Sequence, residues 1–283
     1  MRPSNAVRTV WDAEVIDTSH PDFRPIQKIA TIHASSGFIW GIRLCGASGD
    51  EMRTGIARAQ RVVSRFVATG QIGSWPTPVI RRYFDGGPAF FVQVGSCDGK
   101  LGDPLYELIK SNPQWSGIFI EPVDYVFKAL VRNYGNDPRY VFEQVAIADE
   151  PGERAFYYVS EEAVGIPGFY QCEQLGSFDR NHILKHGTTL EPYIITQRVR
   201  CEPLSSVLDR NKVERVDIIH IDAEGYDYHV LKQIDFSRFS PKLVLYEHVH
   251  LKHDESKAAI NLLSSHGYRC ANFGMDTLAI RRP

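Results

Sequence analysis

The pattern of apolar residues changes near residue 86 of this 283-residue chain. Beyond that point, short apolar runs such as AFFVQV (89–94) alternate with segments whose apolar residues recur at helical spacing. Strands that alternate with helices are typical of a mostly parallel sheet with helices on both faces. The pattern therefore predicts a Rossmann-like α/β domain over 86–283.

The individual elements follow from the same alternation. Strands are expected at 89–94, 118–121, 139–148, 154–159, 216–221 and 242–248, and helices at 103–110, 123–133 and 254–266, with another helix ending at 231. The last two strands, 268–273 and 277–282, are close enough to form an antiparallel edge hairpin. The segment 160–192 interrupts the alternation, and both a lid or substrate loop and a plain surface excursion fit its length.

Residues 1–85 form an N-terminal extension with a weaker pattern. A strand is expected at 39–44 and an amphipathic helix at 51–69, which Gly70, Gly73, Pro76 and Pro78 would end. The first 36 residues show little periodicity. Such an extension could pad the core, cover a site or pair two subunits into a homo-oligomer, and the sequence does not choose among these roles.

Composition narrows the function classes. Hydrophobic residues make up 43% and charged residues 23%, as in ordinary globular proteins, and the net charge of −2 without a basic run argues against nucleic acid as a partner. The N-terminus lacks the apolar core of a signal peptide, and no apolar stretch reaches the ~20 residues of a membrane helix. Five widely spaced cysteines without a C-x-x-C pair favour reduced thiols. We expect a cytoplasmic protein.

The loop after the strand at 89–94 is a candidate cofactor site, because ligands of open parallel sheets bind beyond the carboxyl ends of the strands. It reads Gly95-Ser96-Cys97-Asp98-Gly99. A dinucleotide fingerprint would place a glycine at 97, where the side chain of Cys97 obstructs a pyrophosphate. S-adenosylmethionine (SAM) has no phosphate, and the charge of Asp98 suits its sulfonium. A plain tight turn is the alternative.

Glu121 follows the next strand, 26 residues after Gly95. An ionised carboxylate at this position can accept hydrogen bonds from both hydroxyls of a ribose. The alternative is an acid at a helix N-terminus before Pro122, favoured by the helix dipole.

Several segments resemble one known family in order and spacing. The segments FFVQVGSCDG, IFIEPVDYVFKAL, VFEQVAIADEPGERAFYYV and VDIIHIDAEGYDYHVLKQI, followed by PKLVLYEH, are similar to motifs of the FkbM family of SAM-dependent methyltransferases. The resemblance runs from about Phe90 to Glu247. It implies a Rossmann-like methyltransferase with SAM as cofactor, acting on a hydroxyl of a sugar, glycoconjugate or natural product.

The resemblance assigns roles residue by residue. Gly95 and Gly99 match the cofactor loop and Glu121 the ribose-binding acid, and adenine is expected at Ala146 and Ile147. Asp222 and Glu224 match the family's D-x-E-G motif. There are three departures from the family pattern. Gln93 replaces the usual acid before the glycine loop, Ser96-Cys97-Asp98 replaces A-N-x within it, and His220 replaces the usual lysine before Asp222.

The remaining candidates concern the chemistry of transfer. A hydroxyl needs a base or a metal to become a good nucleophile. Asp222 is a candidate base or acceptor-orienting group, Glu224 a candidate base or helix cap, and His248 a candidate base. An oxygen-rich divalent metal site could combine Asp222, Glu247 and His250. Candidate acceptor contacts in the 160–192 segment are Asp179, His182 and His186.

Two other function classes fit parts of the pattern. A nucleotide-linked oxidoreductase would use the same sheet edge but lacks its second loop glycine. A catalytically silent binding module would keep the fold without turnover. The expected partner of the enzyme is a small-molecule or glycan acceptor.

Overall fold

The computed structural model describes residues 9–14, 29–35, 38–44, 76–166 and 171–281. The chain divides into two units. One comprises Met1–Trp75 with Cys270–Gly274, and the other comprises Pro76–Arg269 with Met275–Pro283. Within the described ranges, no helix is both long and apolar enough to cross a membrane.

The N-terminal unit contains a three-stranded antiparallel sheet in the order β1 (Thr9–Glu14), β2 (Ile29–Ser35) and β3 (Phe38–Leu44). The strand expected at 39–44 corresponds to β3. Strands β1 and β2 lie within the first 36 residues, where the sequence shows little periodicity, and the sequence analysis did not predict them. The helix expected at 51–69 lies outside the described residues.

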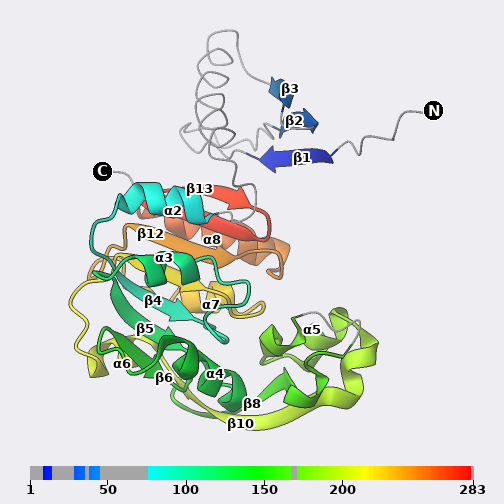
Figure 1. Cartoon of the computed structure of the whole chain (residues 1–283), viewed down its shortest axis with the longest axis vertical. Helices are drawn as coiled ribbons and strands as arrows, with labels where there is room; N and C mark the ends of the chain where they lie inside the picture. The colour runs from blue at the N-terminus through cyan, green and yellow to red at the C-terminus, as the bar shows by residue number, and fades with distance from the viewer. Residues whose placement is uncertain (1–8, 15–28, 36–37, 45–75, 167–170, 282–283) are drawn as a thin grey trace. The chain divides into compact units, whose positions relative to one another are not determined.

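The larger unit contributes six whole strands to a seven-stranded sheet, visible in Figure 1, whose edge strand β13 has most of its residues in the other unit. Its order is β13 (Tyr268–Phe273), β14 (Asp276–Arg281), β12 (Leu243–Glu247), β11 (Ile218–Ile221), β4 (Phe90–Val94), β5 (Ser116–Ile120) and β6 (Tyr140–Glu143). The strands from β12 to β6 run parallel, and β14 pairs with β12 antiparallel. The predicted parallel sheet with an antiparallel edge is confirmed.

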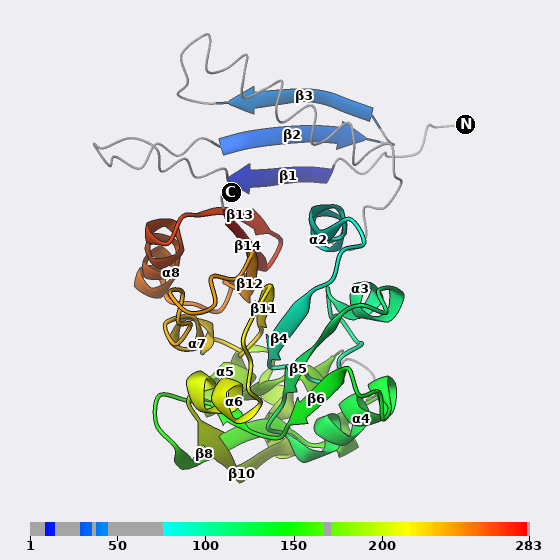
Figure 2. The ribbon, with the colours of Figure 1, turned by 90° about the vertical axis from the view of Figure 1, so that its left-hand side faces the viewer.

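Helices cover both faces of this sheet. Figure 2 shows α3 (Tyr106–Ser111) and α4 (Asp124–Tyr134) on one side, with α6 (Leu204–Arg210), α7 (Asp227–Leu231) and α8 (His253–Ser265) on the other. Every residue of β11 and β12 is buried, as expected for central strands between two helical layers. This arrangement confirms the Rossmann-like α/β class.

A second sheet of four strands leaves the main one at the end of β6. Its order is β7 (Ala146–Ile147), β10 (Ile194–Glu202), β8 (Gly152–Val159) and β9 (Gly176–Ser177). Its apolar side packs on α4 through a buried cluster that joins Val123 and Val126 to Phe156 and Val199. The sheet therefore carries the segment 160–192 next to the carboxyl edge of the main sheet.

The segment 160–192 has a small core of its own. It holds three short 3-10 helices, Glu161–Ala163, Cys172–Gln174 and Thr188–Tyr193, and the helix α5 (Arg180–Lys185). Val159, Cys172, Leu175 and Ile183 are among the buried residues that pack together there. This segment is thus a folded insertion.

Three sequence expectations need correction. The strand expected over 139–148 is two strands in different sheets, β6 and β7, because the chain turns away at Gln144–Val145. Strand β10 and helix α6 were not anticipated. Pro76 and Pro78 begin a helix, α2 (Thr77–Phe84), because proline is well tolerated in a first helical turn.

Candidate cofactor and active site

The turn after β4 approaches the end of β11 closely at Gly95. Gly95 has φ +75°, and a Cβ there would lie 1.7 Å from the carbonyl oxygen of Asp222. The amide of Asp222 in turn donates to the carbonyl of Val94 over 2.9 Å. A side chain at 95 would therefore separate the two central strands at the sheet's carboxyl edge, which explains the glycine independently of any ligand.

The rest of the glycine loop is held by its own side chains. The Ser96 hydroxyl donates to the Gln93 carbonyl and accepts from the Ile120 amide, each over 3.1 Å. One Asp98 oxygen accepts from the amides of Lys100 and Leu101. A Cβ at Gly99 would lie 2.5 Å from Leu130.

Glu121 lies directly against this loop. Its two carboxylate oxygens accept from the amides of Cys97, at 2.9 Å, and Val123, at 2.8 Å. The residue is 6% exposed. Burial raises the pKa of Glu121 to about 7, and the two backbone hydrogen bonds act in the opposite direction. Each oxygen retains a lone pair for a ligand hydroxyl.

A pocket joins the two sheets at this edge. Its lining includes Gly95, Cys97 and Glu121 from one side and Asp222 and Glu224 from the other. The predicted adenine contacts, Ala146 and Ile147, also line the pocket, from β7 rather than from a main-sheet strand. The remaining predicted loop residues, Ser96, Asp98 and Gly99, hold the turn and do not line the pocket.

The insertion supplies another wall of the pocket. Its lining residues there are Glu173, Gln174, Leu175, Gly176 and Phe178. The ring of Phe178 packs edge-on against Tyr226, with ring centroids 5.0 Å apart. The insertion therefore contributes residues to the pocket lining.

The D-x-E-G loop after β11 is shaped by a residue that the sequence interpretation did not single out. Asp227 is fully buried, and its two oxygens accept from the amides of Ala223, at 3.2 Å, and Gly225, at 3.1 Å. These bonds hold Glu224 in a left-handed conformation, φ +49°. The only sequence signal was an acid five residues after Asp222.

Buried acids concentrate at this edge. Burial raises the pKa of Asp222 well above its usual value, and the carboxyls of Glu224 and Asp276 add to the rise. Burial also raises the pKa of Glu224 to about 7. Carboxyl groups this close in a low-dielectric site cannot all ionise. The pocket would accordingly favour a ligand that brings positive charge.

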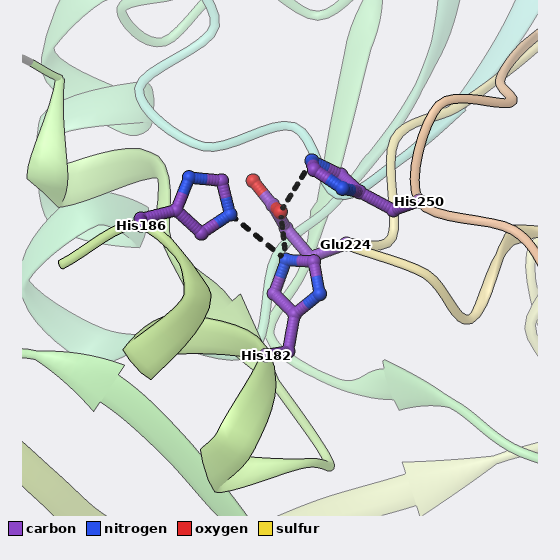
Figure 3. A group of neighbouring side chains, drawn as sticks. All are labelled: His182, His186, Glu224 and His250. Atoms are coloured by element: carbon purple, nitrogen blue, oxygen red, sulfur yellow. Dashed lines mark hydrogen bonds and ion pairs between the residues drawn. The ribbon is translucent and has the colours of Figure 1, made fainter. Parts of the chain in front are cut away.

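The residues predicted as a histidine base or as metal ligands do not form one site. His248 lies outside the pocket, with Nδ1 3.1 Å from the Thr277 hydroxyl. Glu247 is buried beside His250, 3.7 Å from its Nε2. His250, however, gathers with Glu224, His182 and His186, whose ligating atoms all lie within 4.8 Å of one another (Figure 3). Asp222 and Glu247 are not in this cluster.

Comparison with known families identifies the domain. Residues 93–270, more than half of the chain, match the model of the FkbM methyltransferase domain. The chain belongs to the FkbM methyltransferase family. Its pocket is thus the candidate methyl-transfer site of an FkbM domain, and membership of the family supports SAM-dependent methylation.

No curated protein matches the chain in sequence. Among solved structures, a Methanococcus jannaschii fibrillarin, a pre-rRNA processing protein, is similar with a TM-score of 0.36 and 10% identity, over 69% of this chain and 66% of that one. A fibrillarin/Nop5p complex gives 0.37 and 9%, over 69% and 74%. A precorrin-6y C5,15-methyltransferase from Geobacter metallireducens GS-15 gives 0.35 and 10%, over 69% and 82%. The chain spans just under two thirds of the first of these.

Proposed function

We propose that this FkbM domain binds SAM in the pocket and methylates a hydroxyl oxygen of a small-molecule or glycan acceptor, such as a sugar, glycoconjugate or natural product. The observation that carries the proposal is the position of Glu121. Its carboxyl group lies in the same pocket as Gly95 and Asp222, within hydrogen-bond distance of the glycine loop. That is where a ribose would lie in an adenosyl site.

The chemistry of the lining fits each part of the cofactor. Glu121 has lone pairs left for the ribose hydroxyls. Ala146 and Ile147 offer an apolar surface to adenine, and the buried acids at this edge together favour a ligand that carries positive charge. When bound, SAM supplies a methyl group activated by its sulfonium.

Asp222 is the group best placed to manage the acceptor proton. It lines the pocket at the end of β11, and its raised pKa brings a carboxylate closer to the range where a general base works at neutral pH. In our proposal the Asp222 carboxylate would take the proton of the acceptor hydroxyl as that oxygen bonds to the methyl carbon, while the bond from that carbon to sulfur breaks and SAH leaves. His248, which does not line the pocket, is a weaker candidate for this role.

The test is calorimetric titration of the full chain with SAM, S-adenosylhomocysteine (SAH) and NAD⁺, followed by measurement of SAH formation with hydroxyl-bearing acceptors. We expect binding of both adenosyl ligands and none of NAD⁺. Binding of NAD⁺ in preference to SAM would favour the oxidoreductase. Failure to bind any of the three would favour a silent binding module.

A further inference from the structure

Three histidines and one glutamate from two parts of the fold converge on one point. His182 lies on α5 and His186 four residues later at its C-terminal end, so both project from the same helix face. Glu224 belongs to the D-x-E-G loop after β11, and His250 follows β12. Figure 3 shows the three rings around the carboxyl group of Glu224.

The spacing of the ligating atoms is close to that of a metal site. His182 Nε2 lies 2.5 Å from Glu224 Oε2 and 3.4 Å from His186 Nε2. His250 Nε2 lies 3.8 Å from the same Glu224 oxygen. Ligands about 2.1 Å from a tetrahedral ion are about 3.4 Å apart. Only the His182–Glu224 pair is closer, as a hydrogen bond that an ion would replace.

Hydrogen bonds alone cannot satisfy this arrangement. His182 Nε2 contacts both Glu224 Oε2 and His186 Nε2, yet an imidazole nitrogen either donates one proton or offers one lone pair. If it donates to Glu224, it cannot accept from His186. A cation at the centre would use every one of these lone pairs at once.

The protonation states agree with a cation. Burial lowers the pKa of all three imidazoles, that of His250 to about 4, so each ring is neutral near pH 7. Neutral imidazole is the form that binds metals.

We propose that His182, His186, Glu224 and His250 bind one divalent first-row transition ion of the Zn²⁺ class. Three imidazole nitrogens and one carboxylate oxygen suit Zn²⁺ and its neighbours, whereas Mg²⁺ and Ca²⁺ prefer oxygen ligands throughout. This ligand set differs from the oxygen-rich set of Asp222, Glu247 and His250 expected from the sequence, and it retains only His250.

The position of the ion gives it a structural task. Two ligands belong to the insertion and two to loops at the carboxyl edge of the main sheet. The same insertion walls the pocket through Glu173, Leu175 and Phe178. By binding ligands from both parts, the ion would hold the insertion in place beside the pocket and so strengthen cofactor binding. We call this the fastening role. This second part rests on the proposed SAM site, whereas metal binding does not.

Metal binding is tested on the full chain without cofactor. Chelator-treated protein is titrated with Zn²⁺ by calorimetry and with Co²⁺ by visible absorption. Wild type should bind one ion per chain, with the intense d–d bands of four-coordinate Co²⁺. His186→Ala and His250→Ala should each weaken Zn²⁺ binding by about 100-fold or more. Loss of an outer-shell partner already costs up to about 100-fold, and each of these variants removes a direct ligand.

His253→Ala is the matched control, because His253 is an exposed histidine at the start of α8. It should bind Zn²⁺ like wild type, and circular dichroism should show all variants folded. No stoichiometric binding by wild type, or equal affinity in wild type and both cluster variants, would overturn the site.

The fastening role has a separate readout. The Kd for SAH is measured on wild type with and without one equivalent of Zn²⁺, and on His186→Ala under both conditions. Zn²⁺ should tighten SAH binding to wild type at least about tenfold and leave the variant unchanged. Zn²⁺ binding with no change in SAH affinity would refute the fastening role. Loss of SAH binding under every condition would refute the SAM site and leave the metal site standing.

Discussion

Gln93 and His220 occupy paired positions on the two central strands, β4 and β11. Both are buried, and neither Gln93 Oε1 nor His220 Nδ1 has a hydrogen-bond partner. Burial lowers the pKa of His220 to about 4, so the ring is neutral at pH 7. These two departures from the expected family motifs are therefore neighbours across the central strands, and in this chain both side chains are neutral.

This pairing predicts non-additive effects on stability. His220→Lys places an unpaired charge between the strands and should lower the free energy of unfolding by about 3–5 kcal/mol. Adding Gln93→Asp should recover at least about 1 kcal/mol. Urea unfolding of both single variants and the double variant measures the coupling. Strictly additive losses would mean that the two positions do not communicate.

The second prediction concerns Glu121. Replacement by alanine removes two charge-assisted hydrogen bonds to ribose and should cost about 2–4 kcal/mol, or about 30- to 1,000-fold in the Kd for SAM. The exposed Glu150→Ala is the control for loss of an acid. Calorimetry gives both affinities, and unchanged binding by Glu121→Ala would remove the ribose contact.

The third prediction separates chemistry from binding at Asp222. Asp222→Asn should keep the Kd for SAM within about threefold and lower kcat by about 10²–10⁴-fold, the usual contribution of a general base. Asp254→Asn is the control for loss of an acid, because Asp254 is exposed at the start of α8 and lies outside the pocket. Undiminished turnover by Asp222→Asn would take this residue out of the reaction.

The fourth prediction is a proton release on cofactor binding. Glu121, with a pKa of about 7, is partly protonated at neutral pH in the free protein. A bound sulfonium favours its ionised form and lowers this pKa. SAM should therefore release more protons at pH 7 than SAH, which lacks the charge. Calorimetry in buffers of different ionisation enthalpy measures this, and equal release by the two ligands would contradict it.

The same pKa shift contributes to the pH dependence of the stability of the free protein. The folded carboxyl of Glu121 holds a proton that the unfolded chain, with a pKa near 4.5, has already lost. Its contribution to stability is thus complete below about pH 4.5 and is lost as the pH rises through about 7. Urea unfolding without cofactor should show this loss between pH 5 and pH 8, reduced in Glu121→Gln.

The fifth prediction compares two glycines with left-handed φ. Gly95→Ala combines about 1–2 kcal/mol for the left-handed backbone with about 1–3 kcal/mol for the clash with the Asp222 carbonyl. Gly86→Ala has φ +76° but nothing within 4 Å, so it should show only the first cost. Thermal unfolding of the two variants isolates the contact between β4 and β11. Equal losses would show that the clash is relieved elsewhere.

The spacing of apolar residues along the chain was enough to predict most strands and helices of the main domain. Short apolar runs ending at Gly95, Glu121 and Asp222 indicated parallel strands with their chemistry at one edge, and the structure has them there. The late hairpin was also recognisable, because two strands separated by a short turn have little choice but to pair. These features are local, so the order of residues is enough to predict them.

Other features depend on contacts between distant segments. The run over 139–148 looks like one strand, but whether Ala146 pairs with β5 or with Cys201 on β10 depends on the distant chain beside it. The pattern of apolar residues likewise did not predict that β8 pairs with β9 and β10, or how the insertion folds.

Sequence alone determined the glycine loop, the acid at 121 and the D-x-E-G motif, because each of them depends on a strand end and the residues directly after it. Only the tertiary structure brought His182 and His186 to Glu224 and His250. These residues span 182 to 250 and come from an insertion and two separate strand ends, and no local pattern encodes which distant loops will meet. Proximity of this kind arises only when the insertion packs against the sheet edge.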